Sequence, residues 1–211
     1  MRPGSSFCFI LIAAPLLCAG ITTYAPLIQY KAGPGKKVGV IGIGGLGHVA
    51  IQWAAALKCD EVVAISSSDS KREESKKLGA TKFVNSKNEA EMKAAAQSMD
   101  IILCTSFDKN ADWGALLSLV ANNGKMVILA LPEAPLTIEA GAFVQRQVSM
   151  VGSLIGGKKM TREMLDFAAK HNVRPWIEKM PMSDCNAAVK HVIEGHPRYR
   201  VVMETAAAAK V

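Results

Sequence analysis

The chain has 211 residues, enough for one domain with a full hydrophobic core and part of a second. Half of the residues are hydrophobic and 20% are charged, which excludes wholesale disorder. The net charge of +7 is dispersed and only 6% of residues are aromatic, so nucleic-acid binding is not expected, whereas a polyanionic small molecule suits such a surface.

The N-terminal stretch "MRPGSSFCFILIAAPLLCAG" has the outline of a secretory signal, with a basic residue, an apolar run and small residues after it. It is too short to predict a membrane span. A secreted or anchored protein is therefore one open interpretation of this end of the chain.

From Lys36 onward, short apolar runs alternate with longer helical patterns. The sequence predicts strands over 37–42, 61–66, 82–85, 100–106, 125–131 and 147–153. It predicts helices over 47–58, 69–80, 88–99, 111–124 and 161–172, with Asp69 and Thr161 as candidate N-caps and Gly79 near a helix end.

The strand runs are continuously apolar, which indicates burial on both faces and hence a parallel sheet covered by helices. The predicted fold class is α/β, a doubly wound parallel six-stranded Rossmann sheet. The segment from Arg174 to Glu204 predicts a strand, a helix capped by Ser183 or Asp184, and a strand. It has too little apolar area for its own core, so it should pack on something else.

Three glycines follow the first predicted strand in the pattern G-x-G-x-x-G: Gly42, Gly44 and Gly47. In a nucleotide-binding loop the first makes a tight turn, the second lets the backbone approach a pyrophosphate, and the third lets helix and strand pack closely. The intact strand–helix–strand context favours a binding loop over a purely structural turn.

At the end of the second predicted strand, where NAD-binding folds carry Asp or Glu, the chain has Ser66, Ser67 and Ser68. Hydroxyls can donate to a 2′-phosphate, and Lys71 and Arg72 supply countercharge. The run therefore favours NADP over NAD. A serine-rich loop that caps the next helix is the alternative, and both can hold together.

The cysteines are scattered and no two form a C-x-x-C pair, which argues against a disulfide framework. Cys59 and Cys104 are expected to be buried thiols in a reducing compartment, and we expect a cytoplasmic protein.

Four motifs together closely resemble those of the zinc-dependent medium-chain alcohol dehydrogenases, in particular the NADP-using branch of cinnamyl alcohol dehydrogenase type. They are "AAPLLCAGITTYAPL", "VGVIGIGGLGHVAIQWA", "SSSDSKREE" and "VGSLIGG". The resemblance runs from about Ala13 to Glu204. It implies reversible oxidation of primary alcohols, often aromatic or allylic, to aldehydes with NADP and zinc.

The resemblance also implies roles for individual residues. Cys18 would be a ligand of the catalytic zinc. Ser66, Ser67, Ser68 and Lys71 would hold the 2′-phosphate, and the backbone from Ser153 to Ile155 would face the nicotinamide carboxamide and the seam of a homodimer formed through the sixth-strand edge. The residues expected to line the rest of the cofactor site are Thr22, Gly42, Gly44, Gly45, Leu46 and Gly47.

Much of the family's pattern has no counterpart in this sequence, including its other zinc ligands, its structural zinc lobe and its proton relay. Cys18 alone cannot hold a catalytic zinc, and without one it would be a buried cysteine. We therefore expect residues 1–12 to be an atypical leader, 13–156 an NADP-binding Rossmann domain and 157–211 an incomplete segment of a catalytic domain.

Two function hypotheses follow. The chain is a truncated NADP-dependent alcohol or aldehyde oxidoreductase that is inactive alone, or it is a non-catalytic NADP-binding or oligomerisation module. If the chain lacks a partner half, an apolar surface near Cys18 and along the C-terminal strand should be exposed, and an aggregated product with such a surface would count against the module.

Overall fold

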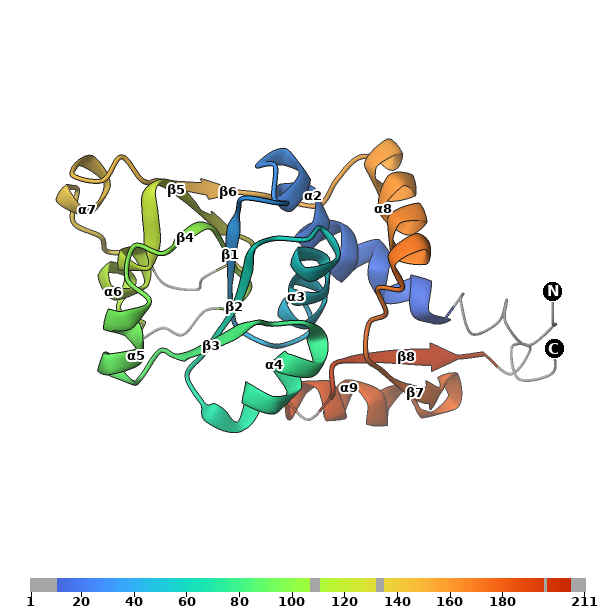
Figure 1. The fold of residues 1–211 in the computed structure, drawn as a ribbon. Helices are drawn as coiled ribbons and strands as arrows, with labels where there is room; N and C mark the ends of the chain where they lie inside the picture. The colour runs from blue at the N-terminus through green and yellow to red at the C-terminus, as the bar shows by residue number, and fades with distance from the viewer. Residues whose placement is uncertain (1–10, 107–110, 132–134, 196, 206–211) are drawn as a thin grey trace.

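The computed structural model describes residues 11–106, 111–131, 135–195 and 197–205 (Figure 1). Six strands form one sheet in the order β3-β2-β1-β4-β5-β6, with every neighbouring pair parallel. They are β1 (Lys37–Ile41), β2 (Glu61–Ser66), β3 (Lys82–Asn85), β4 (Met99–Cys104), β5 (Val120–Ile128) and β6 (Ser149–Gly152). The doubly wound six-stranded fold predicted from the sequence is confirmed.

Helices cover both faces of this sheet (Figure 1). On one face lie η1 (Leu16–Gly20), α2 (Ile21–Gln29), α3 (Gly47–Ala56), α4 (Arg72–Leu78) and α8 (Lys158–His171), and on the other lie α5 (Glu89–Ala94) and α6 (Trp113–Ser118). The remaining short helices are η2 (Asp69–Lys71), α7 (Gly141–Val144), η3 (Met182–Asp184) and α9 (Cys185–Ile193).

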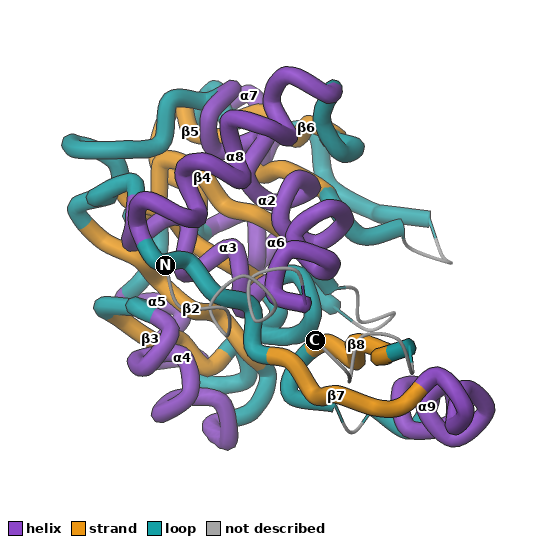
Figure 2. The backbone as a smooth tube through the Cα atoms, turned by 90° about the vertical axis from the view of Figure 1, so that its right-hand side faces the viewer, coloured by secondary structure: helices purple, strands orange, loops and turns teal. Residues whose placement is uncertain are grey.

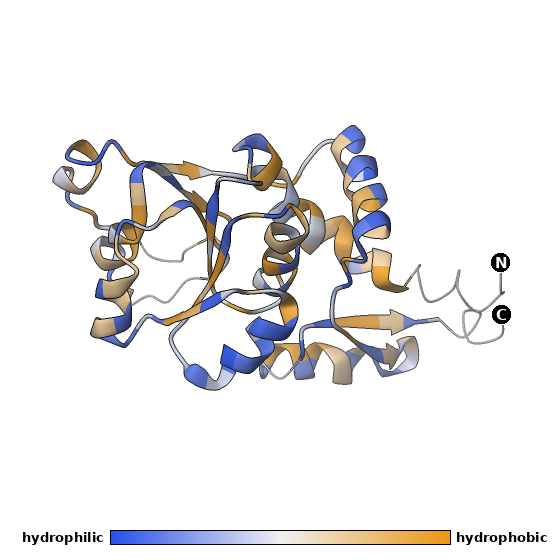
Figure 3. Ribbon diagram, in the orientation of Figure 1, coloured by the Kyte–Doolittle hydropathy of each residue, from blue (hydrophilic) through white to orange (hydrophobic). Residues whose placement is uncertain are grey.

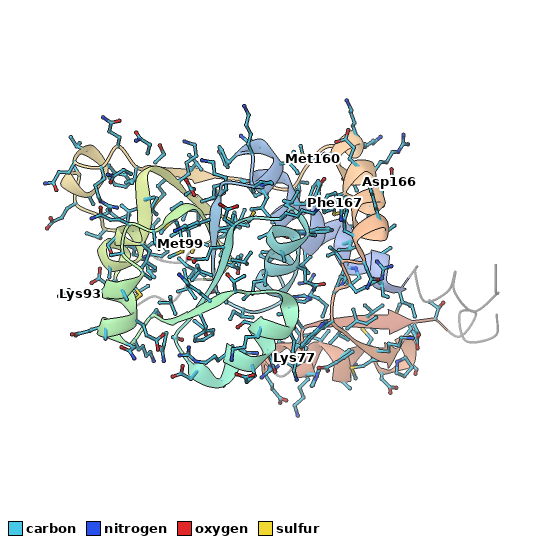
Figure 4. The ribbon with its side chains drawn as sticks, viewed as in Figure 1. Lys77, Lys93, Met99, Met160, Asp166 and Phe167 are labelled. Carbon is cyan, nitrogen blue, oxygen red and sulfur yellow. The ribbon has the colours of Figure 1, made fainter. Side chains whose placement is uncertain are left out.

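The core has two parts, one on each face of the sheet. Trp53 of α3 is fully buried in the first, and Met99 of β4 is fully buried in the second. Phe167 of α8 points toward α2 and α3 while Asp166 lies on the outer side of that helix (Figure 4), and Phe167 meets the Tyr24 ring at 5.6 Å. Helix α8 is therefore part of the sheet's own core and not a detached element.

Residues 11–29 form one helical run that is long and apolar enough to cross a membrane by length and composition, and it is 61% buried inside the protein. Leu16 and Leu27 lie in the first core. This burial is what a core helix of a globular domain shows. The π-helical turn η1 presents Leu17 and Cys18 at the surface, so the expected exposed surface near Cys18 is confirmed. Most of the predicted leader lies outside the described residues.

The predicted helix over 111–124 is wrong in its second half, because α6 ends at Ser118 and β5 begins at Val120. Val120 is fully buried and pairs with Met99, after which the register shifts. Gly124 sits so close to the Asp100 carbonyl that an added Cβ would lie 2.9 Å from it. Packing against β4 overrides the local helix propensity here.

Of the predicted caps, Gly79 is confirmed: it ends α4 with φ +108°, in the left-handed region that favours glycine. The predictions of Asp69 and Thr161 as N-caps are wrong. Ser68 caps η2, with its hydroxyl accepting from Ser70 N, and Gly157 precedes α8. Cys104 is buried as expected, and burial raises its pKa to about 11, whereas Cys59 is only partly buried.

The C-terminal segment forms a second, two-stranded parallel sheet of β7 (Ile177–Pro181) and β8 (Arg200–Glu204), with α9 beside it. Figure 2 shows this sheet standing apart from the six-stranded one. Tyr199, immediately before β8, belongs to the first core. As expected, the segment packs on another part of the protein, and that part is the six-stranded domain.

Candidate functional site

A cleft of about 510 Å³ opens at the carboxyl ends of β1, β2 and β4. This is the edge of a doubly wound sheet at which ligands bind, where the strand order reverses. Four of the predicted cofactor residues line it together: Gly42, Gly44, Ser66 and Ser67. Ser106, Trp113 and Lys87 line it too, and the sequence interpretation had assigned none of them to the site.

The glycine loop has the geometry that a dinucleotide requires. Gly42 has φ +86°, and an added Cβ would stand 2.1 Å from Ser106 Oγ. At Gly47 an added Cβ would lie 1.8 Å from the Gly42 carbonyl oxygen, so α3 packs directly against the end of β1. At Gly44 an added Cβ would meet no atom within 4 Å, so the backbone there is open to a ligand.

Gly45 and Leu46 complete the loop, and Gly45 contacts a residue from the far end of the chain. An added Cβ on Gly45 would lie 3.0 Å from both Cδ and Nη1 of Arg200, in β8. A guanidinium is thus held against the backbone of a loop built to receive an anion. Nothing in the local sequence around Gly45 signals this contact.

His48 joins the same loop to the C-terminal segment. Its side chain is fully buried, with Nδ1 2.8 Å from the Gly44 carbonyl oxygen and Nε2 accepting from the Trp176 backbone N at 3.2 Å. The ring stacks on Tyr199 at 4.7 Å. Burial lowers the pKa of His48 to about 4, so the imidazole is neutral and donates through Nδ1 to Gly44.

The serine run divides into two parts. Ser66 and Ser67 line the cleft, whereas Ser68 is occupied with Ser70, its hydroxyl lying 3.0 Å from that of Ser70. Asp69 binds Arg72 at 2.6 Å and accepts from Asn85 Nδ2 at 2.8 Å, and these contacts lower its pKa. Its carboxylate is therefore already engaged by these two side chains.

Lys71 has partners at the other end of the chain. Its Nζ lies 3.4 Å from Glu74 Oε2, 3.4 Å from the Tyr199 hydroxyl and 4.6 Å from the centre of that ring. The Tyr199 hydroxyl donates to Glu74, and Arg198 Nε lies 3.2 Å from the other Glu74 oxygen. Burial lowers the pKa of Lys71 and raises that of Tyr199. This cluster links α4 to the residues that immediately precede β8.

The residues expected near the nicotinamide lie on two neighbouring segments. Thr22 is buried in α2, and Ser153 and Ile155 follow β6. The segments touch where an added Cβ on Gly156 would meet Ile21 at 2.9 Å. Ile155 has φ +39°, an uncommon conformation for a β-branched residue that needs support from its surroundings. These assignments stay predictions.

Zinc does not fit the described residues. In the ranges that the structure covers, no group of three or more His, Cys, Asp or Glu side chains could hold a metal ion. Cys18 is exposed, not buried as expected for a thiol without zinc, and it belongs to no such group among those residues. Cys8 and His196 lie outside the description.

Residues 45–170 match the family described as zinc-binding dehydrogenase. The chain belongs to this family. The resemblance noted in the sequence motifs is thereby confirmed.

Among curated relatives, NADP-dependent alcohol dehydrogenase C 1 from Mycolicibacterium smegmatis is 46% identical over 92% of this chain and 55% of its own length. The 8-hydroxygeraniol dehydrogenase of Catharanthus roseus is 44% identical over 92% and 54%. Among solved structures, a cinnamyl alcohol dehydrogenase of Sorghum bicolor has a TM-score of 0.85 at 39% identity, over 93% of this chain and 55% of that one. The chain spans about half the length of the relatives it matches.

Proposed function

We propose that this chain binds NADP(H) and forms the cofactor-binding part of an alcohol or aldehyde oxidoreductase of the zinc type. The observation that carries the proposal is that the open glycine loop and the two serines Ser66 and Ser67 line the same cleft. Support comes from a relative named NADP-dependent, and from a solved CAD of Helicobacter pylori in complex with NADP(H), with TM-score 0.78 and 35% identity over 90% of this chain.

In this proposal the loop amides from Gly44 to Gly47 and the N-terminus of α3 hold the pyrophosphate, and Arg200 adds a cation beside Gly45. Ser66 and Ser67 donate to the adenosine ribose and its 2′-phosphate. Thr22, Ser153 and Ile155 lie toward the nicotinamide, which supplies hydride transfer when bound. The substrates are primary alcohols and their aldehydes, of the aromatic or allylic kind that several relatives are named for.

The same proposal includes a cytoplasmic location, a homodimer and the division at residue 156, beyond which α8 still packs in the core of the six-stranded sheet. β6 is the outer strand of the sheet, and Leu154 and Ile155 beyond it are 81% and 52% exposed. An outer strand with exposed apolar side chains invites pairing with a second copy. Light scattering on the chain and on Leu154→Lys tests this, because a dimer through this edge would dissociate in the variant.

Isothermal titration of the chain with NADPH and with NADH tests the cofactor proposal. We expect sub-millimolar binding of NADPH, tighter than that of NADH, and a weaker NADPH complex for Ser67→Asp, because a carboxylate repels the 2′-phosphate. Ser70→Asp is the matched control, since Ser70 does not line the cleft. Failure to bind either nucleotide would reject the proposal.

A non-catalytic module is the second candidate, favoured by the lack of a metal-binding group among the described residues. The two candidate functions differ in whether the chain takes part in catalytic turnover. Co-expression with the remaining portion of a relative should restore alcohol oxidation if the chain is part of an enzyme. Binding without turnover in every such combination would favour the module.

A further inference from the structure

The two ring nitrogens of His48 have fixed and different roles. Nε2 lies 3.2 Å from the backbone N of Trp176, which can only donate, so Nε2 accepts and carries no proton. The proton of the neutral ring is therefore on Nδ1, which donates to the Gly44 carbonyl oxygen at 2.8 Å. Because the side chain is fully buried and its ring stacks on Tyr199, the imidazole cannot turn over without losing both hydrogen bonds.

The Gly44 carbonyl oxygen receives two donors from this one residue. The backbone N of His48 lies 3.1 Å from it and Nδ1 lies 2.8 Å from it. A carbonyl oxygen has two lone pairs, so both are used and the oxygen is held on the side of the buried ring. The peptide is trans, and in a trans peptide the carbonyl and the following N–H point in opposite directions. The N–H of Gly45 therefore faces away from His48.

The orientation of this peptide needs support because the peptide joins two glycines. With no Cβ on either side, its plane can turn over at little steric cost, and an added Cβ on Gly44 would meet no atom within 4 Å. A turned peptide would present its carbonyl oxygen, the negative end of the dipole, to an incoming phosphate. Donation from His48 opposes that turn and keeps an N–H available to an anion.

The second ring nitrogen connects His48 to the C-terminal segment. The Trp176 carbonyl accepts from Tyr199 N at 3.0 Å and from Arg200 N at 3.2 Å, so Trp176 joins the start of β8 to His48. If the segment moved away, Nε2 would lose this donor while still buried, which costs free energy. By reciprocity, a ligand that stabilises the oriented loop also stabilises the docked segment.

We propose that His48 is a positioning residue for the glycine loop: it orients the Gly44–Gly45 peptide for the pyrophosphate and, through Trp176, links NADP(H) affinity to the docking of residues 174–204. The inference rests on the proposed function and adds a means by which the C-terminal segment controls the loop. Because NADPH and NADH share the pyrophosphate, the effect is the same for both.

The first experiment is isothermal titration of the full chain, His48→Gln and His48→Asn with NADPH, NADH and adenosine 2′-phosphate. The Gln amide reaches the place of Nε2 and can accept from Trp176, whereas the shorter Asn amide takes the place of Nδ1 and can donate to Gly44. We expect His48→Gln to weaken NADPH and NADH by the same factor, about tenfold. Adenosine 2′-phosphate has no pyrophosphate and should change by less than about twofold, and His48→Asn should bind all three within about threefold of the unmodified chain.

His171→Gln is the matched control. This histidine is exposed, stacks on Phe167 and is not among the residues that line the cleft, so its variant should bind all three ligands as the unmodified chain does.

The second experiment is hydrogen exchange of the Trp176 amide, measured by NMR with and without NADPH. Trp176 does not line the cleft, yet in the unmodified chain NADPH should slow this exchange about tenfold. In His48→Asn the amide loses its acceptor, so NADPH should slow the exchange by less than about twofold. A histidine with a merely structural role would leave the ligand's effect on this amide unchanged.

Four results would overturn the inference. NADPH binding in His48→Gln equal to that of the unmodified chain would show that His48 does not orient the loop. Weakening of adenosine 2′-phosphate along with the dinucleotides would show general damage to the domain. An undiminished effect of NADPH on the Trp176 amide in His48→Asn would place the link elsewhere. If the unmodified chain binds neither nucleotide, the proposed function fails and this inference with it, an outcome that the titration of the unmodified chain alone reveals.

Discussion

The six-stranded sheet and the β7–α9–β8 segment are both parallel α/β structures, yet they are stabilised in opposite ways. The inner strands of the large sheet are buried on both faces, with residues such as Val40, Ile65 and Leu103 fully inaccessible. In β8 only Val202 is buried, and α9 leaves Val192 and Ile193 51% and 79% exposed. Figure 3 shows that the ribbon of α9 is largely hydrophobic, whereas that of α4 is largely hydrophilic.

The large sheet is thus held by apolar burial, and the C-terminal segment by a few specific contacts. They include the His48–Trp176 hydrogen bond, the Tyr199 contacts with Glu74 and Lys71, and Arg200 against Gly45. Directional contacts contribute about 1 kcal/mol each, whereas a fully buried apolar side chain contributes about 2 kcal/mol. The C-terminal segment therefore contacts the glycine loop directly, at Gly45 and His48. A change in the position of this segment should change the shape of the loop.

The largest effect should come from the large sheet. Gly47→Ala places a Cβ 1.8 Å from the Gly42 carbonyl oxygen, a backbone clash that side chains cannot relieve. We expect a loss of at least about 3 kcal/mol in the free energy of unfolding, measured by urea titration. Gly44→Ala is the control, since its Cβ meets nothing: stability should stay within about 0.5 kcal/mol while NADPH binding weakens. Equal stability of the two variants would contradict the packing described for α3.

The next prediction concerns His48, which links the glycine loop to the C-terminal segment, and the dependence of stability on pH. Because the pKa of His48 falls from 6.5 unfolded to about 4 folded, the unfolded chain binds more protons between these values. Stability is therefore complete above pH 6.5 and is lost as the pH falls toward 4. From pH 7.5 to 5.5 we expect a loss of about 1.3 kcal/mol. In His48→Gln this pH dependence should shrink by that amount, because the variant has no imidazole to protonate. An undiminished dependence would mean that other groups cause it.

A smaller loss of stability is expected at the contacts of Tyr199 with Glu74 and Lys71. Tyr199→Phe removes the hydroxyl that donates to Glu74 and contacts Lys71, and keeps the ring that stacks on His48. The expected loss is about 1–2 kcal/mol by urea unfolding. Tyr30→Phe is the comparison, because the Tyr30 hydroxyl makes only a 3.5 Å contact with Gln29. A loss as small as that of Tyr30→Phe would show that the cluster does not hold β8.

The smallest change in stability belongs to α9. Val192→Lys replaces a half-exposed apolar side chain, so the free energy of unfolding should change by about 0.5 kcal/mol or less. Self-association, followed by light scattering against concentration, should nevertheless fall, because exposed apolar patches promote it. If association is unchanged, another surface drives it, and Leu154 beyond β6 is the next to test.

The sequence predicted the sheet well because its signals are local. Continuous apolar runs marked all six strands, and Gly42, Gly44 and Gly47 stood between a strand and a helix as the loop requires. The boundary of α6 was missed because Val120 is drawn into the sheet by Met99, a partner 21 positions away in the chain whose pairing no local pattern shows.

The site was predicted only in part. Ser66 and Ser67 follow from their place at the end of β2, but the pairing of Lys71 with Tyr199 spans 128 positions. Arg200 reaches Gly45 from β8 in the same way. Such contacts depend on how the C-terminal segment packs against the glycine loop and α4. The composition and the spacing of residues do not predict this packing. His48, directly after the glycine loop, was the one local signal that could have pointed to the contact between this loop and the C-terminal segment.

The three tryptophans of the chain happen to stand one in each part of this arrangement. Trp53 is fully buried and donates through Nε1 to the Gly20 carbonyl at 3.2 Å, Trp113 lines the cleft, and Trp176 accepts Tyr199 N at its carbonyl, 3.0 Å away. Their fluorescence divides accordingly. Trp53 reports the integrity of the core, Trp113 reports what enters the cleft, and Trp176 reports whether the C-terminal segment is docked, so single-tryptophan versions of the protein would give three independent optical channels on one molecule.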